Sequence, residues 1–152
     1  MIVYEFLSQS SVCTDDLHDI NLLIETLSRA KTAPKTRWDT LYEAVRHSRV
    51  LVARDETRRR TDWSSAIVGM ATLTPKYKVS NTSGDIEEVV VDPRYQGQGI
   101  GRKLTEKLIE EARRLTMTEL ELTSHPSRIA ANELYKSLDF KLRQNAYRLM
   151  LI

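Results

Sequence analysis

The chain of 152 residues has one cysteine, five glycines, four prolines and only two phenylalanines. The single cysteine, Cys13, excludes an intramolecular disulfide and a cysteine-based metal cluster, so nothing in the sequence indicates a metal site. The sequence also lacks an apolar run long enough to span a membrane, and Met1 to Glu5 lack the basic start and apolar core of a secretory signal. We therefore expect a cytoplasmic protein with no metal and no membrane partner.

A marked excess of one charge is also missing, because 23 basic and 21 acidic residues leave a net charge of +2. A surface with such a balance does not favour nucleic-acid binding, and we expect no nucleic-acid partner. The one local excess is Arg58-Arg59-Arg60, a short run without interleaved aromatic residues. A solvated hairpin tip explains this run better than a phosphate site does, but the sequence leaves its role open.

The length fits a single domain, residues 1–152, and the hydrophobic share of 41% is sufficient for one core. Residue patterns predict strands over 2–6, 50–53, 66–71, 86–91 and 119–122, a turn at 81–84, and a last strand marked by Tyr147, Leu149 and Leu151. Helical spacing predicts helices over 15–27 (with Thr14 as its cap), 38–45, 101–115 and 127–138. This order indicates an α/β fold in which helices cover both faces of a mixed sheet.

Three of the five glycines lie at alternate positions in the loop Gln96-Gly97-Gln98-Gly99-Ile100-Gly101, between a predicted strand and a predicted helix. The loop therefore presents uncovered backbone N–H groups at the positive end of a helix, which indicates an anion site. We expect the anion to be a phosphate of a nucleotide-like cofactor. A plain tight turn does not explain three glycines within five residues.

Two common nucleotide sites fit this loop poorly. Arg102 stands where a dinucleotide-binding loop has its third glycine. The loop also ends Gly101-Arg102-Lys103-Leu104 and lacks the Gly-Lys-Ser/Thr end of a P-loop. Dinucleotide binding and nucleoside triphosphate hydrolysis are therefore disfavoured.

The loop resembles the Arg/Gln-x-x-Gly-x-Gly/Ala motif of the GNAT superfamily of N-acetyltransferases, and Val89-x-Val91-x-Pro93 resembles the strand that precedes it in that family. The first motif position is Gln96, where many members have arginine. This departure leaves the binding of phosphate to neutral amides, Arg102 and Lys103. The resemblance extends from Ile86 to Leu151 and is weak before Val68.

A second part of the chain carries the same resemblance. Asn132, Leu134, Tyr135 and Phe140 resemble the family's Asn-x-x-Leu-Tyr-x-x-x-Gly-Phe segment, with the asparagine one residue nearer the Leu-Tyr pair. Asp139 stands where a glycine often precedes the phenylalanine. Aspartate adopts such a helix exit at modest cost, so the departure does not threaten the assignment.

The resemblance implies a single-domain GNAT-like fold, with a mostly antiparallel central sheet and a splayed pair of parallel strands, 86–91 and 120–124. It implies that acetyl-coenzyme A lies in the gap between these strands and that its pyrophosphate lies on the glycine loop. The residues that it implies in cofactor binding are Val89, Val90, Val91, Gln96, Gly97, Gln98, Gly99, Ile100, Gly101, Arg102, Lys103, Asn132 and Tyr135.

Amide formation needs a base, because an alkylamine with a pKa of about 10 is mostly protonated at neutral pH. Glu87 and Glu88 are the candidates, and Glu87 is preferred because it resembles a catalytic glutamate of the family. Neighbouring side chains of a strand point to opposite faces, so only one glutamate is expected to face the site unless a bulge alters the strand. Tyr135 is the candidate acid that protonates the departing thiolate.

The resemblance implies direct transfer of an acetyl group from acetyl-coenzyme A to a primary amine of a small molecule or a peptide. The alternative is a non-catalytic sensor of acyl-coenzyme A or a module that recruits a partner. The presence of both Tyr135 and a strand carboxylate argues against this alternative. The sequence does not identify the amine, and the alternating C-terminal strand is compatible with a homodimer.

Overall fold

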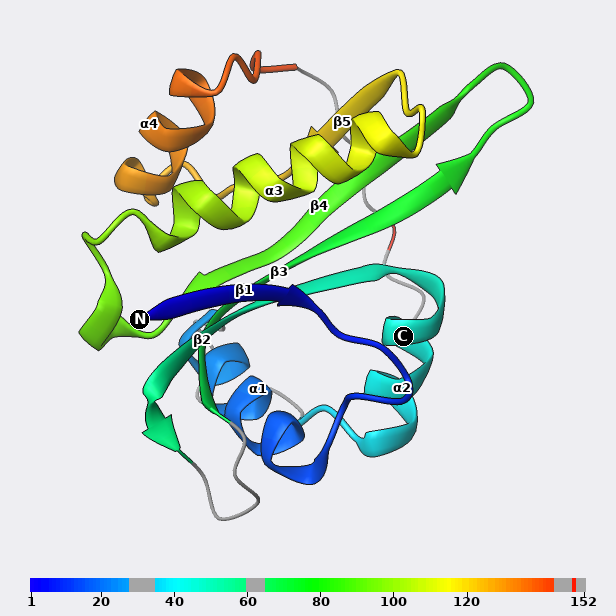
Figure 1. Ribbon diagram of the computed structural model, residues 1–152. Coiled ribbons are helices and arrows are strands. Elements are labelled where there is room, and N and C mark those ends of the chain that lie inside the picture. The colour runs from blue at the N-terminus through cyan, green and yellow to red at the C-terminus, as the bar shows by residue number, and fades with distance from the viewer. Residues whose placement is uncertain (28–34, 60–64, 144–148, 150–152) are drawn as a thin grey trace.

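The computed structural model describes residues 1–27, 35–59, 65–143 and 149, and its centre is one mixed sheet (Figure 1). The strands are β1 (Ile2–Phe6), β2 (Arg49–Arg59), β3 (Ser65–Tyr77), β4 (Thr82–Val91) and β5 (Glu119–Leu122). They lie in the order β1-β2-β3-β4-β5. All neighbours are antiparallel except β4 and β5, which are parallel. The predicted mixed, mostly antiparallel sheet is confirmed.

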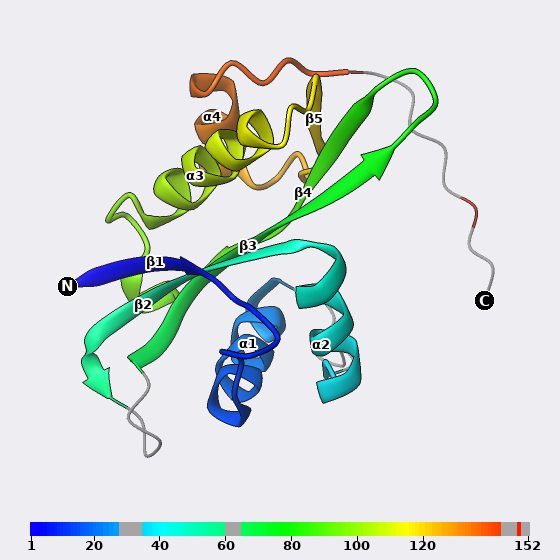
Figure 2. The ribbon, with the colours of Figure 1, turned by 45° about the vertical axis from the view of Figure 1, so that its right-hand side comes forward.

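Helices cover both faces of this sheet (Figures 1 and 2). Helices α1 (Thr14–Leu27) and α2 (Trp38–His47) lie on one face, and α3 (Ile100–Arg114) lies on the other with α4 (Ile129–Ser137) beside it. A short 3-10 helix, η1 (Pro93–Tyr95), follows β4. Because strand side chains alternate, β2 sends Val50 and Val52 into the core under α1 and α2, and Leu51 and Ala53 into the core under α3.

The hairpin between β3 and β4 projects beyond the rest of the sheet (Figure 2). Its turn is closed by the Lys78 N–H, which donates to the Asn81 carbonyl at 2.9 Å, and Gly84 already belongs to β4. A Cβ at Gly84 would lie 2.7 Å from Leu73 Cδ1 and 2.8 Å from Met117 Sδ. The predicted turn at 81–84 was therefore wrong for Thr82, Ser83 and Gly84, which belong to β4, and Gly84 allows close packing inside the sheet.

The start of α1 differs in detail from the prediction. Thr14 is the first helical residue, and the N–H of the preceding Cys13 donates to Asp16 Oδ2 at 3.1 Å. A carboxylate at the third helical position thus binds the backbone before the helix, as in a capping box. The predicted last strand lies outside the described residues except for Leu149, which is exposed.

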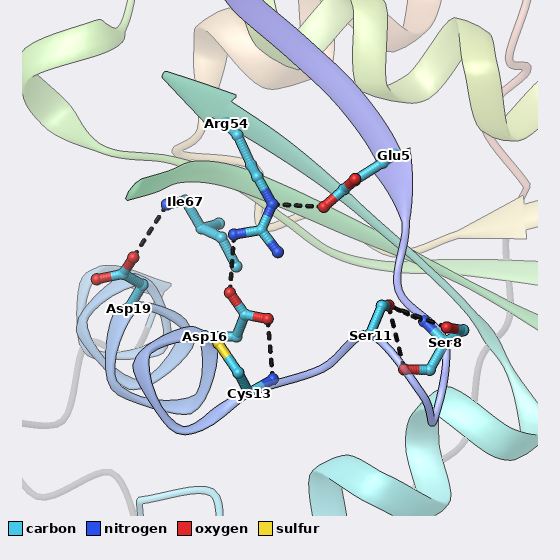
Figure 3. A network of polar contacts seen from close by, with 8 residues as sticks. All are labelled: Glu5, Ser8, Ser11, Cys13, Asp16, Asp19, Arg54 and Ile67. Atoms are coloured by element: carbon cyan, nitrogen blue, oxygen red, sulfur yellow. Dashed lines mark hydrogen bonds and ion pairs between the residues drawn. The ribbon is translucent and has the colours of Figure 1, made fainter. Parts of the chain in front are cut away.

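A buried ionic network joins α1 to the sheet (Figure 3). Arg54 of β2 donates through Nη1 to Asp16 Oδ1 at 2.7 Å and through Nε to Glu5 Oε1 at 2.5 Å. The Asp16 side chain is only 1% exposed and that of Arg54 only 11%. One turn further along α1, Asp19 Oδ2 accepts the Ile67 N–H of β3 at 3.0 Å. These contacts fix α1 relative to three strands.

We predict that Arg54→Met lowers the free energy of unfolding by about 3–5 kcal/mol, because it leaves the Asp16 carboxylate buried without its charged partner. Chemical denaturation followed by circular dichroism measures this change. Lys136→Met is the control, since its pair with Glu133 is exposed and such pairs contribute about 0–1 kcal/mol. Equal effects of the two substitutions would contradict the prediction.

Candidate functional site

The sheet opens in its interior, between β4 and β5. The parallel pairing joins Ser83–Ile86 to Glu119–Leu122 and ends there. From Glu87 to Val91, β4 is paired with β3 on one side, and within the described residues no strand pairs with its other side. Unpaired backbone groups of a strand are hydrogen-bonding sites for an extended ligand. This open edge is the first part of the candidate site.

A β-bulge occurs in β4 where the opening begins. Thr72 of β3 pairs with Glu87 and Met70 pairs with Val90, so Glu88 and Val89 of β4 both lie opposite the one residue between them, Ala71. Glu88 has a φ of 54°, a left-handed conformation that is uncommon for a residue with a side chain. The bulge therefore breaks the alternation of side chains along β4.

Both glutamates consequently lie on the sheet face that α1 and α2 cover. Thr72 Oγ1 donates to Glu88 Oε2 at 3.3 Å, and Thr74 Oγ1 donates to Glu87 Oε2 at 3.0 Å. Thr72 and Thr74 are two residues apart on β3, so their side chains share one face. A regular strand would place only one of the two glutamates on this face, and the bulge, the exception allowed in the sequence-based expectation, places both there.

The carboxyl groups of the two glutamates have different surroundings. Glu88 forms part of the wall of a cavity of about 80 Å³ between the sheet and helices α1 and α2. Partial burial raises the pKa of the Glu88 carboxyl, and the charge of Glu87 acts in the same direction, while the hydrogen bond from Thr72 lowers it. Both glutamates are exposed residues, but Glu87 does not line this cavity. Asp85, another acidic residue of β4, forms an ion pair with Lys76 at 2.6 Å.

The glycine loop lies directly after β4 and η1. Gly97 and Gly99 have φ values of 78° and 81°, which L-residues rarely adopt, and no atom lies within 4 Å of a Cβ built on either. Gly99 is the residue before the first turn of α3, and no side chain caps this helix. The glycines thus permit the backbone conformation and leave the start of α3 uncovered, which confirms the predicted strand–loop–helix unit.

The loop is held in place from β2, through Tyr95. The Tyr95 hydroxyl donates to Asp55 Oδ2 at 2.7 Å, and Asp55 Oδ1 accepts the N–H and the hydroxyl of Thr57 at 2.9 Å and 2.7 Å. The Arg58 guanidinium lies 5.9 Å from the centre of the Tyr95 ring, within the range of a cation–π contact. Arg58 therefore packs on the segment before the glycine loop, a role that the sequence did not predict. The side chains of Arg59 and Arg60 lie outside the described residues.

Two further predicted cofactor residues have partners within the chain. Gln96 Nε2 donates to the Val91 carbonyl at 3.1 Å. Arg102 Nη2 donates to Ser137 Oγ at 2.5 Å and so connects the first turn of α3 to α4, while Lys103 is exposed. Gln96 and Arg102 thus also have structural roles next to the loop.

Helix α4, which carries Tyr135, packs near the start of α3, since Leu134 Cδ2 lies 3.9 Å from a Cβ built on Gly101. The Tyr135 ring is 7% exposed and makes an edge-to-face contact with Phe140, with ring centres 6.0 Å apart. Burial raises the pKa of the Tyr135 hydroxyl, which keeps it protonated at neutral pH.

Asn132 stabilises the segment that follows β5. Its Nδ2 donates to the carbonyl oxygens of His125 and Pro126 at 3.0 Å and 3.3 Å. This segment is where β5 leaves the parallel pairing with β4. The sequence predicted only a cofactor contact for Asn132, and the contacts within the chain give it a second role.

A larger hollow, of about 330 Å³, lies between β1 and α3. It contains none of the predicted site residues. Among its charged residues, Glu111 is paired with Arg114 at 2.6 Å and with Arg49 at 3.0 Å. We therefore place the candidate site at the strand opening rather than in this hollow.

No group of three or more His, Cys, Asp or Glu side chains in the part of the chain that the structure describes is arranged to hold a metal ion. No helix there has the length and apolar character needed to cross a membrane.

The contacts of Asp55 generate a prediction about acid stability. The hydrogen bond from Tyr95, followed by those from Thr57, lowers the pKa of the Asp55 carboxyl from 3.8 to about 2. A carboxyl whose pKa is lower in the folded state stabilises the fold above its unfolded pKa, and this contribution is lost as the pH falls from about 4 to 2. Asp55→Asn should therefore flatten the pH dependence of thermal unfolding between pH 4 and 2. If Asp55→Asn showed the same pH dependence of the melting temperature as the wild-type protein, the hydrogen bonds from Tyr95 and Thr57 to Asp55 would be contradicted.

The chain matches known proteins over most of its length. The model of the acetyltransferase (GNAT) family matches residues 15–140. A ribosomal protein bS18-alanine N-acetyltransferase of Escherichia coli is 44% identical over 62 residues, which are 39% of this chain and 42% of that protein. The histone acetyltransferase TAP1 of Glycine max is 26% identical over 130 residues, which are 83% of this chain and 52% of that protein. The chain thus spans about half or less of the length of these relatives.

Solved structures agree with this match. A Trypanosoma brucei acetyltransferase has a TM-score of 0.74 and 25% identity, with 99% of this chain and 100% of that chain covered. The fold is also similar to that of a glucosamine-6-phosphate N-acetyltransferase from Arabidopsis thaliana, with a TM-score of 0.76, 18% identity and coverage of 100% and 99%. The family match over residues 15–140, together with the opened sheet and the glycine loop, shows that the chain belongs to the GNAT family of acetyltransferases.

Proposed function

We propose that this chain transfers an acetyl group directly from acetyl-coenzyme A to a primary amine. The observation that carries the proposal is the free edge of β4 beyond Ile86, which leads through η1 to the glycine loop. The pantetheine arm has amide groups that suit a strand edge, and its pyrophosphate suits open N–H groups at a helix start. Membership of the GNAT family supports the same donor.

The residues proposed to hold the donor follow this path along the chain. Val89, Val90 and Val91 offer main-chain groups, since the side chains of Val89 and Val91 pack under α3 and that of Val90 packs under α1 and α2. The loop from Gln96 to Gly101 offers N–H groups, with Arg102 and Lys103 as nearby positive charges. Asn132 and Tyr135 are the residues of α4 proposed to contact the donor.

We propose Glu88 as the base, in preference to Glu87. The Glu88 carboxyl lines a cavity and has a raised pKa, two properties that suit a group taking a proton from an amine. Acetyl-coenzyme A supplies the acetyl thioester. As the amine nitrogen bonds to the acetyl carbon and the carbon–sulfur bond breaks, Glu88 passes a proton from the amine to solvent.

Tyr135 is proposed to donate its hydroxyl proton to the departing sulfur and to recover a proton from solvent. The hydroxyl is protonated at neutral pH, as a proton donor must be, although the burial that raises its pKa also makes it a weaker acid. The ammonium form of the acceptor loses two protons in the whole reaction. One is balanced by the proton on the thiol product and the other is released to solvent.

The test is calorimetric titration with acetyl-coenzyme A, followed by thiol release in the presence of a panel of amines. Wild-type protein should bind the donor and release thiol only when an amine is added. Tyr135→Phe should bind the donor but release thiol about 10²- to 10⁴-fold more slowly, the range for loss of one acid–base group. Binding without turnover on any amine would favour a non-catalytic module, and no binding would overturn the proposal.

A second prediction separates the two glutamates. Because a base must be deprotonated, wild-type kcat/KM should rise with pH through the pKa of Glu88, which lies above the ordinary value of 4.5. Glu88→Gln should lower kcat by about 10²-fold or more and remove this acid limb. Glu110→Gln, on the exposed side of α3, is the control for a lost charge. A larger loss in Glu87→Gln than in Glu88→Gln would assign the base to Glu87.

A further inference from the structure

The cavity beside Glu88 is the feature of this site that bears on the acceptor. It lies between α1, α2 and the sheet, at the β4 bulge. Ile20 and Ile24 of α1, Leu41 and Ala44 of α2, and Met70 of β3 form apolar walls. Threonine side chains, Thr72 among them, supply the remaining polar surface apart from Glu88.

The charges around this cavity limit what it accepts. Among the described residues that line it, Glu88 is the only charged one and none is basic. A phosphate group would find no cation among these residues. A polycation would find one carboxylate in the wall, because Asp85 is already paired with Lys76 at 2.6 Å and Glu87 does not line the cavity. The cavity therefore suits one ammonium or amine group next to an uncharged group.

The size of the cavity limits that uncharged group. An engineered apolar cavity of about 150 Å³ holds a benzene molecule. The cavity beside Glu88, at about 80 Å³, is close to half that volume. The cavity is partly open to the surface, so this volume describes its enclosed part, which suits an aliphatic group smaller than a benzene ring.

From this combination we infer that the acceptor is a primary amine whose carbon carries a compact aliphatic group, which enters the apolar cavity while the nitrogen lies against Glu88. The N-terminus of a peptide that begins with a small residue has this chemistry. The inference rests on the proposed acetyl transfer and adds the substrate class to it. Ile24 and Ala44 are then residues that determine specificity.

The experiment compares kcat/KM for short peptides that begin with alanine, leucine, phenylalanine or lysine, with spermidine and glucosamine 6-phosphate as contrasting amines. The alanine peptide should exceed the phenylalanine peptide, spermidine and the sugar phosphate by about 10-fold or more, the discrimination that small misfits in an apolar pocket produce. A higher kcat/KM for spermidine, the sugar phosphate or the phenylalanine peptide overturns the inference.

Two variants test the cavity itself. Ala44→Leu fills it and should lower kcat/KM for the alanine peptide by about 10-fold or more. Ile24→Ala enlarges it and should shift the preference toward the leucine and phenylalanine peptides. Arg46→Leu is the matched control, because it introduces leucine on the exposed side of α2 and should leave the wild-type preference intact.

Calorimetry with acetyl-coenzyme A on each variant separates the possible failures. Loss of peptide activity with unchanged donor binding and an unchanged melting temperature supports the inference. If Ala44→Leu and Arg46→Leu behave alike, or if the donor binds and none of the peptides is acetylated, the inference is overturned. If wild-type protein does not bind the donor, the proposed acetyl transfer itself fails.

Discussion

The candidate site depends on the separation of β4 from β5 after Ile86. An interior strand with a free edge is costly unless its backbone groups find other partners, so the rest of the fold has to hold β4 in position without β5. Pairing with β3 does this on one side. Packing of Val89 and Val91 under α3, and of Val90 under α1 and α2, does it on both faces. The opening is therefore kept by the core on either side of the sheet.

The bulge at Glu88 and Val89 lies directly after the point where β4 separates from β5. An extra residue in β4 is accommodated opposite Ala71 where no β5 partner constrains the other edge. The extra residue turns Glu88 toward α1 and α2 and returns Val89 to the α3 side. A carboxylate and a free strand edge thus occur at one place in the sheet, as a base beside an acyl donor requires.

Much of the fold and part of the site follow from local sequence signals. The helices and strands with strong periodicity, and the glycine loop between β4 and α3, depend on residues close together in the chain, and the structure confirms them. The bulge could not be predicted, because the register between Met70–Thr72 and Glu87–Val90 is set by pairing across the hairpin. Gly84 resembles a turn residue in sequence, and only the distances to Leu73 and Met117 reveal its packing role. The assignment of Glu88, Tyr135 and the cofactor residues stays a prediction.

The contact between Tyr95 and Asp55 has a consequence for how this fold can be divided. The motifs recognised in the sequence lie after Ile86, which would suggest a portable half that carries the glycine loop, whereas the family model matches residues 15–140. The segment before the loop, however, is anchored to β2, because the Tyr95 hydroxyl donates to Asp55 and Arg58 lies over the Tyr95 ring. Asp55 and Arg58 precede Tyr95 by 40 and 37 residues in the chain. A chimaera that joined residues 86–140 to an unrelated N-terminal half would keep the glycines but lose this anchor. A chimaera of this chain therefore keeps the contacts that position the glycine loop only when β2 and the loop come from the same parent protein.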